Sequence, residues 1–401
     1  MFENLRKINQ VIRNDEKLAL VFFLVATFVS SFYGYTLRFY ILTDIIFHYL
    51  LIFPIFLVFL FYSYCKNPYL KFGWTVLAVG PSVFIIFAVI GQDIPVIYEK
   101  ISFEWVLFIG LLLWACSLMI YLLKRTKQSN PYFSGLKIKT LGLNIITFIR
   151  DWMPIFVVLF SYCTLKSIIP VVNPLLFDEQ FNTMDYFLFL KHSPTALIIK
   201  WIPIFFISFL SFGYKSFFLI KMFAFSSIYC TVKDKRVFYR MVIAFSLTYF
   251  IGLGLYFIFP AQGPIYYHPE KFEAIQTAMS ETTNYKIQRD LWKIYEQVKQ
   301  HTPRKFCELT KTSGIRNGIA AFPSLHIAVS CVLLYFLFRY SRAIFWLCFF
   351  PFWVMVLSTI YFGWHYVVDD IAGFFLAAIV LVLVNHLTNN MVYSQNDMPY
   401  P

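Results

Sequence analysis

Long apolar runs separated by short polar segments are the feature that most constrains how this chain can fold. About 20 consecutive apolar residues cross the hydrocarbon core of a bilayer as one helix. We expect ten such helices, at 18–37, 40–64, 72–91, 102–123, 152–169, 200–230, 239–259, 321–338, 343–362 and 366–388. Only 14% of the residues are charged, too few for the surface of a soluble protein of 401 residues. The sequence therefore predicts an all-α, polytopic membrane protein.

Basic residues mark one side of the predicted bundle. They cluster before the first helix and in every second connection after it, at 66–71, 124–139, 233–240 and 339–342. Lys and Arg are retained on the cytoplasmic side of a membrane. We therefore expect cytoplasmic termini and an outer loop at 261–319. That loop would be periplasmic in a bacterial inner membrane, or luminal in the Golgi or endoplasmic reticulum. The net charge of +13 follows this pattern and does not indicate nucleic-acid binding.

The run at 200–230 is too long for one straight span. A tilted helix, or an interfacial piece followed by a span, would account for its length. Two spans within this run would instead invert the orientation of everything that follows.

A basic, polar stretch at 124–140 divides the predicted helices into two groups. We expect an N-terminal four-helix membrane region at 1–140, a six-helix catalytic core at 141–390 and a short cytoplasmic tail at 391–401. The outer loop includes an amphipathic stretch from Lys271 to Gln300, and loops of this length are uncommon unless they have a function. Nothing in the sequence indicates an oligomeric state.

Polar residues suited to chemistry gather at the outer ends of the last helices. The run 321–338 opens with Ala321-Phe322-Pro323-Ser324-Leu325-His326. Pro323 suits the first helical position, where its missing N–H is not needed. Free N–H groups at a helix start bind anions, and Ser324 adds a hydroxyl donor. This pattern predicts a phosphate site with a histidine beside it.

The last helix is preceded by His365, and Asp369 follows four residues later. Residues i and i+4 share one helix face, so Asp369 is expected to orient His365 and leave its other ring nitrogen as a nucleophile. Asp370 lies about 140° further round the helix and is not expected to share this role. His326 falls on the same side of the membrane, where it could protonate a leaving oxygen.

The sequence predicts no metal and no cofactor. Its seven cysteines are scattered, and no pair has metal-ligand spacing. No cluster of carboxylates with ligand spacing lies beside the histidines.

Residues 321–326, together with Ser358, Thr359, His365 and Asp369, resemble the signature of the type-2 phosphatidic acid phosphatase superfamily. The second motif of that family is PSGH or PSLH, and the chain has PSLH at 323–326. The third motif is SR-x5-H-x3-D, and the chain has Ser358-Thr359 followed at the same spacing by His365 and Asp369. The resemblance covers roughly residues 150–388.

The chain departs from the family pattern at two places. Thr359 replaces the Arg of the third motif, and the first motif, K-x6-RP, is absent. Its place is taken by Phe259-Pro260-Ala261-Gln262-Gly263-Pro264. Both departures are similar to the inositol phosphorylceramide synthase branch, an inositolphosphotransferase group that transfers a phospho-headgroup between lipids.

The resemblance implies a role for each matching residue. His365 would be the nucleophile that forms a phosphohistidine, and Asp369 would orient it. His326 would act first as general acid and then as base. Ser324 and Ser358 would contact phosphate oxygens.

The missing Arg and Lys of the family motifs leave the phosphate charge without its usual cations. Arg316 is the expected replacement, with Lys215 and Lys221 as alternatives. Snorkelling to the cytoplasmic interface is another explanation for Lys221.

Two further polar groups are expected at the membrane interface. Arg38, Asp44 and His48 form one such group. The segment Arg150-Asp151-Trp152 forms the other, as an anchor with Trp152 at headgroup level.

These observations favour a membrane enzyme that acts on a phospholipid or another lipid phosphate. It would be either a lipid phosphatase or a phosphotransferase with an alcohol acceptor. Two other classes stay open from the residues alone. One is a membrane transporter in which the histidines relay protons, and the other is a haem-binding electron carrier with His326 and His365 as axial ligands.

Overall fold

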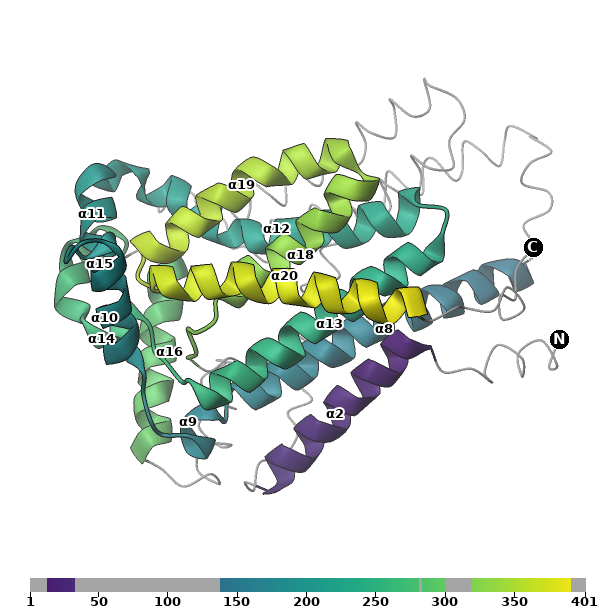
Figure 1. Ribbon diagram of the computed structural model, residues 1–401, viewed down its shortest axis with the longest axis horizontal. Coiled ribbons are helices and arrows are strands. Elements are labelled where there is room, and N and C mark those ends of the chain that lie inside the picture. The colour runs from purple at the N-terminus through teal and green to yellow at the C-terminus, as the bar shows by residue number, and fades with distance from the viewer. Residues whose placement is uncertain (1–12, 33–137, 281–282, 301–318, 391–401) are drawn as a thin grey trace.

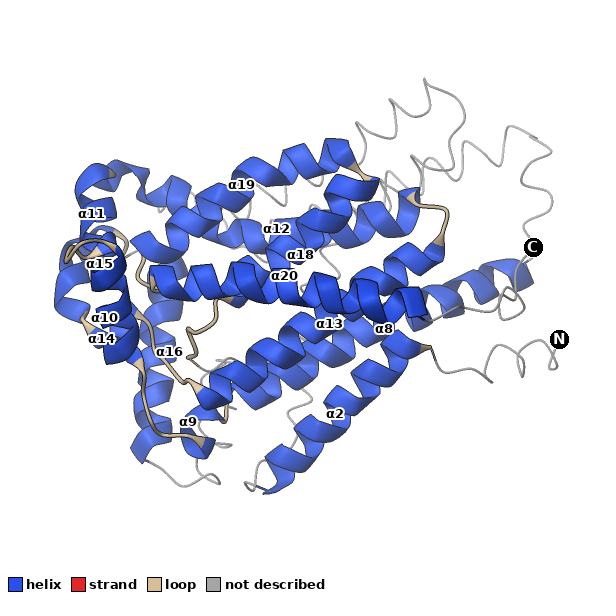
Figure 2. Cartoon of the chain, viewed as in Figure 1, coloured by secondary structure: helices blue, strands red, loops and turns tan. Residues whose placement is uncertain are grey.

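Helices form the regular structure of the computed structural model, which describes residues 13–32, 138–280, 283–300 and 319–390 (Figure 1). No strand occurs among these residues, which confirms the all-α prediction for them (Figure 2). The predicted spans at 40–64, 72–91 and 102–123 lie outside the described residues, as do Arg38, Asp44, His48 and the tail.

Four of the described helices are long and apolar enough to cross a membrane. They are the continuous helix 204–231, which comprises η1 (Ile204–Phe206) and α12 (Ile207–Thr231), together with α13 (Lys235–Ile258), α19 (Arg342–Tyr361) and α20 (Val367–Asn390). A shorter apolar helix, α18 (Leu325–Tyr340), lies among them. These helices match the predicted spans to within a few residues and identify a membrane protein.

The long run at 200–230 contains a break. A short helix, α11 (Pro194–Trp201), ends before Pro203, and the continuous apolar helix begins at Ile204. Proline has no N–H and disfavours helical geometry in the residue before it, which accounts for the helix break at Pro203. The described run therefore holds one spanning helix preceded by a short one.

One hydrophobic cluster joins the bundle. The helix α8 (Ile138–Lys166) packs against α13, which also contacts α18 and α20. On the other side, α12 packs against α18 and α19. The buried apolar side chains of these helices form a continuous core.

The first described helix, α2 (Asn14–Phe32), is part of the same bundle. It packs against α8 and α13 (Figure 1), and its Ala19, Phe22 and Ala26 are buried in the common core. The predicted domain division near residue 140 stays a prediction, because residues 33–137 lie outside the description.

Short helices cover one end of the bundle, at the left of Figure 1. They are α9 (Ile169–Val172), α10 (Asp178–Leu188), α11, α14 (Pro264–Tyr267), η2 (Pro269–Phe272), α15 (Glu273–Ala278) and α16 (Thr283–Gln300). The sequence predicts no span at 170–199, where the structure has α10 and most of α9 and α11. The helix α20 begins at this end, which is where the predicted site residues lie.

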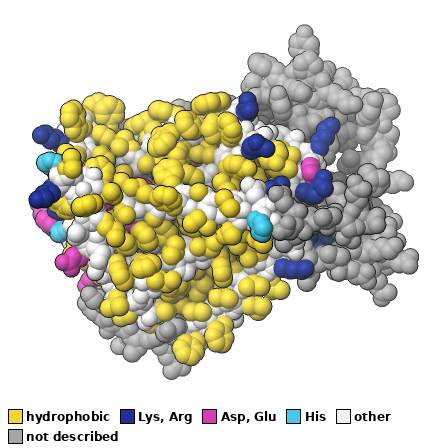
Figure 3. Space-filling model, viewed as in Figure 1, with side chains coloured by type: hydrophobic (Ala, Val, Ile, Leu, Met, Phe, Trp, Pro, Cys, Tyr) yellow, Lys and Arg dark blue, Asp and Glu magenta, His cyan; other side chains and the backbone are white. Residues whose placement is uncertain are grey.

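The outer surface is divided into bands (Figure 3). Apolar side chains cover the middle of the view. Large exposed apolar side chains of α19 and α20 include Trp346, Phe350, Phe375 and Val382. Charged side chains of the described residues gather at its two ends. A bundle that is apolar outside as well as inside is suited to lipid as solvent.

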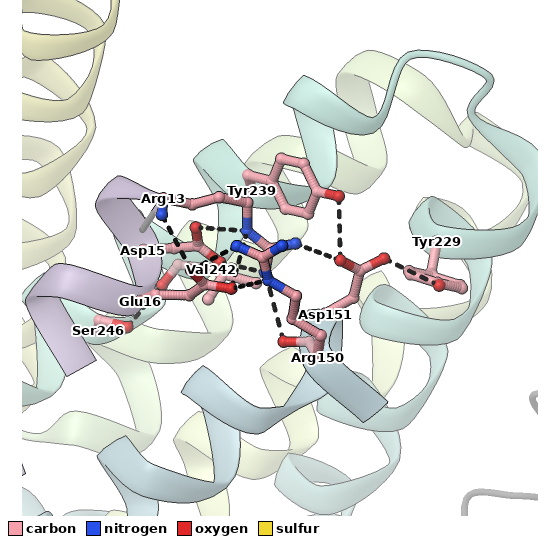
Figure 4. A network of polar contacts seen from close by, with 9 residues as sticks. All are labelled: Arg13, Asp15, Glu16, Arg150, Asp151, Tyr229, Tyr239, Val242 and Ser246. Carbon is pink, nitrogen blue, oxygen red and sulfur yellow. Dashed lines mark hydrogen bonds and ion pairs between the residues drawn. The ribbon is translucent and has the colours of Figure 1, made fainter. Parts of the chain in front are cut away.

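At the end opposite the short helices, a network of charged groups connects α2 to the core (Figure 4). Arg13 forms ion pairs with Asp15 and with the buried Asp151 of α8, and Arg150 pairs with Glu16 at 2.6 Å. Asp151 also accepts hydrogen bonds from two tyrosine hydroxyls, those of Tyr229 and Tyr239.

This network corrects one prediction about the 150–152 segment. Trp152 is only 4% exposed and packs against the rings of Phe225 and Phe238, so it is a core residue and not a headgroup anchor. Asp151 is buried because its ionic and tyrosine partners come from α2, α12 and α13. The sequence of one segment cannot show partners that are so distant.

Candidate active site

The helix α18 begins two residues after Pro323, which is the predicted first helical position. The helix begins at Leu325 with Ser324 in the N-cap position, so Pro323 precedes the helix. The Ser324 hydroxyl makes no capping hydrogen bond to the helix. The Ser324 N–H donates to the carbonyl of Asp369 at 2.9 Å, so this donor is already used and joins the start of α18 to α20.

The two predicted histidines face each other. Nδ1 of His326, in the first turn of α18, lies 3.2 Å from Nε2 of His365, in the connection between α19 and α20. Their ring planes meet at 67°. His365 is only 3% exposed, and His326 is half-buried. Residues 39 positions apart in the chain therefore share a hydrogen bond of ordinary length.

Asp369 lies on the other side of the His365 ring. Its Oδ2 is 3.5 Å from Nδ1 of His365, and the same oxygen accepts the N–H of Tyr366 at 2.9 Å. The carboxylate is held by the first turn of α20, and the i, i+4 relation inferred from the sequence is present. The 3.5 Å separation is longer than a close hydrogen bond.

Asp370 is also buried beside the site. Its Oδ2 accepts a 2.9 Å hydrogen bond from the hydroxyl of Thr359, which occupies the position of the family arginine. Its negative charge acts on the His365 ring, although the sequence analysis set it aside. The side chains of Asp369 and Asp370 point in different directions from α20. His365 precedes this helix, and both carboxylates lie close enough to act on its ring.

Burial determines the charge of the nucleophile candidate. Burial lowers the pKa of His365 to about 4, and the negative charge of Asp370 opposes this shift. His365 is therefore neutral at physiological pH, the form in which an imidazole nitrogen has a lone pair.

Aromatic side chains of α12 form one wall of the site. The rings of Tyr214 and Phe217 lie 5.0 Å and 4.7 Å from the His326 ring. Trp364, next to His365, stacks on Tyr214 at 5.3 Å. This wall restricts the position of His326 and reduces its contact with water.

Two buried polar atoms next to the histidines have no hydrogen-bond partner, namely Trp364 Nε1 and Asp369 Oδ1. Buried polar groups are usually paired, so unpaired ones mark a place suited to a polar ligand or to water.

Two buried aspartates of α10 anchor the loop segments that surround the histidines. Asp185 accepts the N–H groups of Val367 and Val368 at 3.0 Å and 2.9 Å. N–H groups in the first turn of a helix have no partner within that helix, so Asp185 supplies the acceptor. Burial raises the pKa of Asp185 to about 6, and these two N–H groups oppose the shift. The sequence pattern predicts no helix over 178–188, so it gives no indication of these roles for Asp178 and Asp185.

Asp178 holds the turn that replaces the first family motif. Its carboxylate accepts the N–H groups of Gln262 and Gly263, each at 2.9 Å, and the hydroxyl of Tyr366 at 3.1 Å. Gly263 has φ +96°, and a Cβ there would lie 2.5 Å from the carbonyl oxygen of Trp364. Only glycine meets both conditions, so the turn can pass directly against the histidine segment.

Ser358, another predicted phosphate contact, is used in helix packing. The hydroxyl of Ser358 lies 2.8 Å from the carbonyl oxygen of Leu210 and 2.6 Å from that of Val354, so its hydrogen is used in packing α19 against α12. The expected phosphate contact of Ser358 is therefore not supported by this arrangement. Arg316 lies outside the described residues.

No group of three or more His, Cys, Asp or Glu side chains suited to a metal occurs in the described ranges. The arrangement instead brings together a neutral imidazole, a second imidazole at its Nε2 and a carboxylate near its Nδ1. These groups are suited to nucleophilic and acid–base chemistry.

A comparison with family models matches residues 179–383 to the PAP2 superfamily. No curated protein and no solved structure matches the chain. The matched segment is just over half of the 401 residues and contains both histidines, both site aspartates and Asp185 of α10. The chain therefore belongs to the PAP2 superfamily, whose membership indicates a membrane enzyme of the phosphatase type.

Proposed function

We propose that this protein cleaves a lipid phosphoester through a phosphohistidine at His365. The observation that carries the proposal is the contact between His326 Nδ1 and His365 Nε2, with Asp369 on the opposite ring nitrogen. If Nδ1 of His365 carries its hydrogen toward Asp369, Nε2 has the lone pair. His326 is then the donor in the 3.2 Å contact.

The first chemical step follows from these positions. Nε2 of His365 attacks phosphorus, a P–N bond forms, and the P–O bond to the leaving group breaks with its electron pair on oxygen. Protonated His326 gives that oxygen a proton. The two ring nitrogens are too close to hold a phosphoryl group between them, so the substrate must displace their direct contact.

The second step reverses the proton movement. Neutral His326 takes a proton from the attacking hydroxyl, whose oxygen bonds to phosphorus while the P–N electron pair returns to His365. Water as the attacking group gives a phosphatase, and an alcohol gives a phosphotransferase. Thr359 and the 259–264 turn support the transferase outcome, because both are similar to the inositolphosphotransferase branch.

The proposal is tested by incubating the purified protein with headgroup-labelled phospholipids, with and without alcohol acceptors. We expect a labelled product whose identity changes with the acceptor. A protein that releases or transfers no label from any phosphoester lipid would refute the enzyme assignment.

Variants distinguish the roles of the site residues. His365→Ala and His326→Ala are each expected to abolish turnover while the protein stays folded. Asp369→Asn is expected to reduce turnover more than Asp370→Asn. Equal losses for the two asparagine variants would contradict the assignment of Asp369 as the orienting group.

We also propose that the site faces the outer side of the membrane, as the distribution of basic segments predicts. In a cysteine-free variant, Lys293→Cys on α16 should react with a membrane-impermeant maleimide in intact cells. Lys233→Cys, in the exposed turn before α13, should stay protected until the membrane is opened. The reverse labelling pattern would move the active site to the cytoplasm.

A further inference from the structure

A lysine of α12 approaches the histidine pair from within the bundle. Lys221 is only 6% exposed, and its Nζ lies 4.0 Å from the centre of the Phe217 ring, one turn earlier in the helix. Phe217 in turn packs against His326 at 4.7 Å. The Lys221 Nζ therefore lies beside the ring that contacts His326, and also 4.6 Å from the centre of the Phe218 ring. Because the side chain is buried, the expectation that it snorkels to the cytoplasmic interface is wrong.

A second lysine reaches the same region from another helix. Lys166 is the last residue of α8, and its Nζ lies 5.7 Å from the ring centre of the buried Tyr256. Tyr256 lies beside the backbone of Leu325, the residue before His326. The end of α8 and the start of α18 are thus joined through one tyrosine ring.

The two ammonium groups converge. Both act electrostatically on the His326 ring, and both act on Cys163, one turn before Lys166. Lys166 also acts on His365. Within the described residues, neither lysine has a carboxylate at ion-pair distance.

Lys221 is buried and Lys166 half-buried, and lysines without a carboxylate partner are costly in the interior of a membrane protein. Removing an ammonium group from water costs several kcal/mol unless an anion compensates it. Ionisable groups within a membrane bundle are therefore uncommon without a functional reason. A phosphate beside the histidines would supply the missing negative charge, and lysine binds phosphate as a compact point charge.

We propose that Lys166 and Lys221 bind the phosphate group of the substrate and neutralise its charge. They take the place of the family Arg and Lys that this chain lacks, and they do so from helices α8 and α12. The substrate part of this inference rests on the proposed function. The anion site itself requires only the geometry of the two lysines and the histidines.

Binding of inorganic phosphate tests the site separately from catalysis. Radiolabelled phosphate is equilibrated with detergent-solubilised His365→Ala protein, which cannot form the covalent intermediate. Lys166→Met and Lys221→Met are then added singly and together, and Lys166→Arg and Lys221→Arg keep the charge. Lys200→Met removes an exposed lysine from α11 at the same end of the bundle and is the matched control.

We expect each Met variant to weaken phosphate binding about tenfold, which corresponds to about 1.4 kcal/mol. The Arg variants and the Lys200 control should stay within a few-fold of the parent. The Met variants should unfold at the same or a higher temperature, because they remove an uncompensated buried charge. In protein with His365 intact, the Met variants should raise KM for a cleaved lipid.

The outcomes separate the two proposals. If the double Met variant binds phosphate as well as the parent, or the parent binds none, the lysine site is refuted. If phosphate binding depends on the lysines but no lipid phosphoester is cleaved, the site stands and the proposed function fails. If lipids are cleaved and the Met variants leave KM and phosphate binding unchanged, only the function stands.

Discussion

Replacing Asp185 with Asn should separate local anchoring of the active-site segment from global stability. Asp185 accepts the N–H groups of Val367 and Val368, two and three residues after His365. Asparagine has one acceptor oxygen, and its NH2 group would face the second N–H. One donor would therefore lose its acceptor inside a buried site.

The substitution has two opposing effects on free energy, a local loss of a hydrogen bond and a global removal of a buried charge. A buried N–H without an acceptor costs about 1–3 kcal/mol, so opening of the first turn of α20 should become easier by about 2 kcal/mol. The global effect differs, because burial raises the pKa of Asp185 to about 6 from 3.8. A raised folded-state pKa stabilises the fold below about pH 4, and this stabilisation is lost as the pH rises through about 6. At pH 7.5 the charged side chain thus costs about 3 kcal/mol, which the neutral Asn avoids.

Hydrogen exchange at pH 7.5 measures how easily the first turn of α20 opens. We expect the Val367 and Val368 amides to exchange about 30-fold faster in the variant, the factor that corresponds to about 2 kcal/mol. The thermal midpoint should change by no more than about 3 °C. Glu179→Gln, an exposed neighbour on α10, should change neither quantity. Unchanged exchange at both valines would refute the anchoring role of Asp185.

Three other predictions follow from the structure. Arg13→Met should lower the unfolding temperature, because it leaves the buried Asp151 without its guanidinium partner, a loss of about 3–5 kcal/mol. The activity per folded molecule should stay unchanged, and a selective loss of activity would contradict the structural role. The His365 ring should stay neutral when the pH is lowered to about 5.5, as 15N NMR with His365→Ala as reference can show. A titration near pH 6.5 would contradict the pKa of about 4. Turnover should persist in excess EDTA, whereas a loss restored by Mg²⁺ or Zn²⁺ would contradict a metal-free histidine mechanism.

Much of the catalytic arrangement could be predicted from local spacing. The pair His365 and Asp369 is set by helical periodicity, and an apolar run predicts a span whatever its neighbours are. The approach of His326 to His365 required one more step, the inference that helices α18 and α20 start on the same side. These features depend on properties within one or two segments.

The parts that could not be predicted depend on partners distant in the chain. Asp178 and Asp185 have the composition of an acidic loop. The packing of α10 makes Asp185 an acceptor for the α20 backbone and Asp178 an acceptor for the Tyr366 hydroxyl and the Gln262 and Gly263 N–H groups. Trp152 has the composition of an interface anchor, but it is buried against side chains of α12 and α13. Lys221 has the position of a snorkelling residue, and its direction along α12 depends on Phe217 and His326.

The pairing of α2 with α8 has a consequence for the order in which the helices assemble during synthesis. Arg13 and Asp151 are 138 residues apart in the chain. At ordinary synthesis rates, α2 waits roughly 10–30 s before its partner segment emerges. During that time its charged end can be stabilised locally, because Arg13 contacts Asp15 and Glu16 of its own helix start. Closure of the bundle is then a late step, and variants at Asp151 should accumulate as inserted but unassembled chains that are exposed to proteolysis.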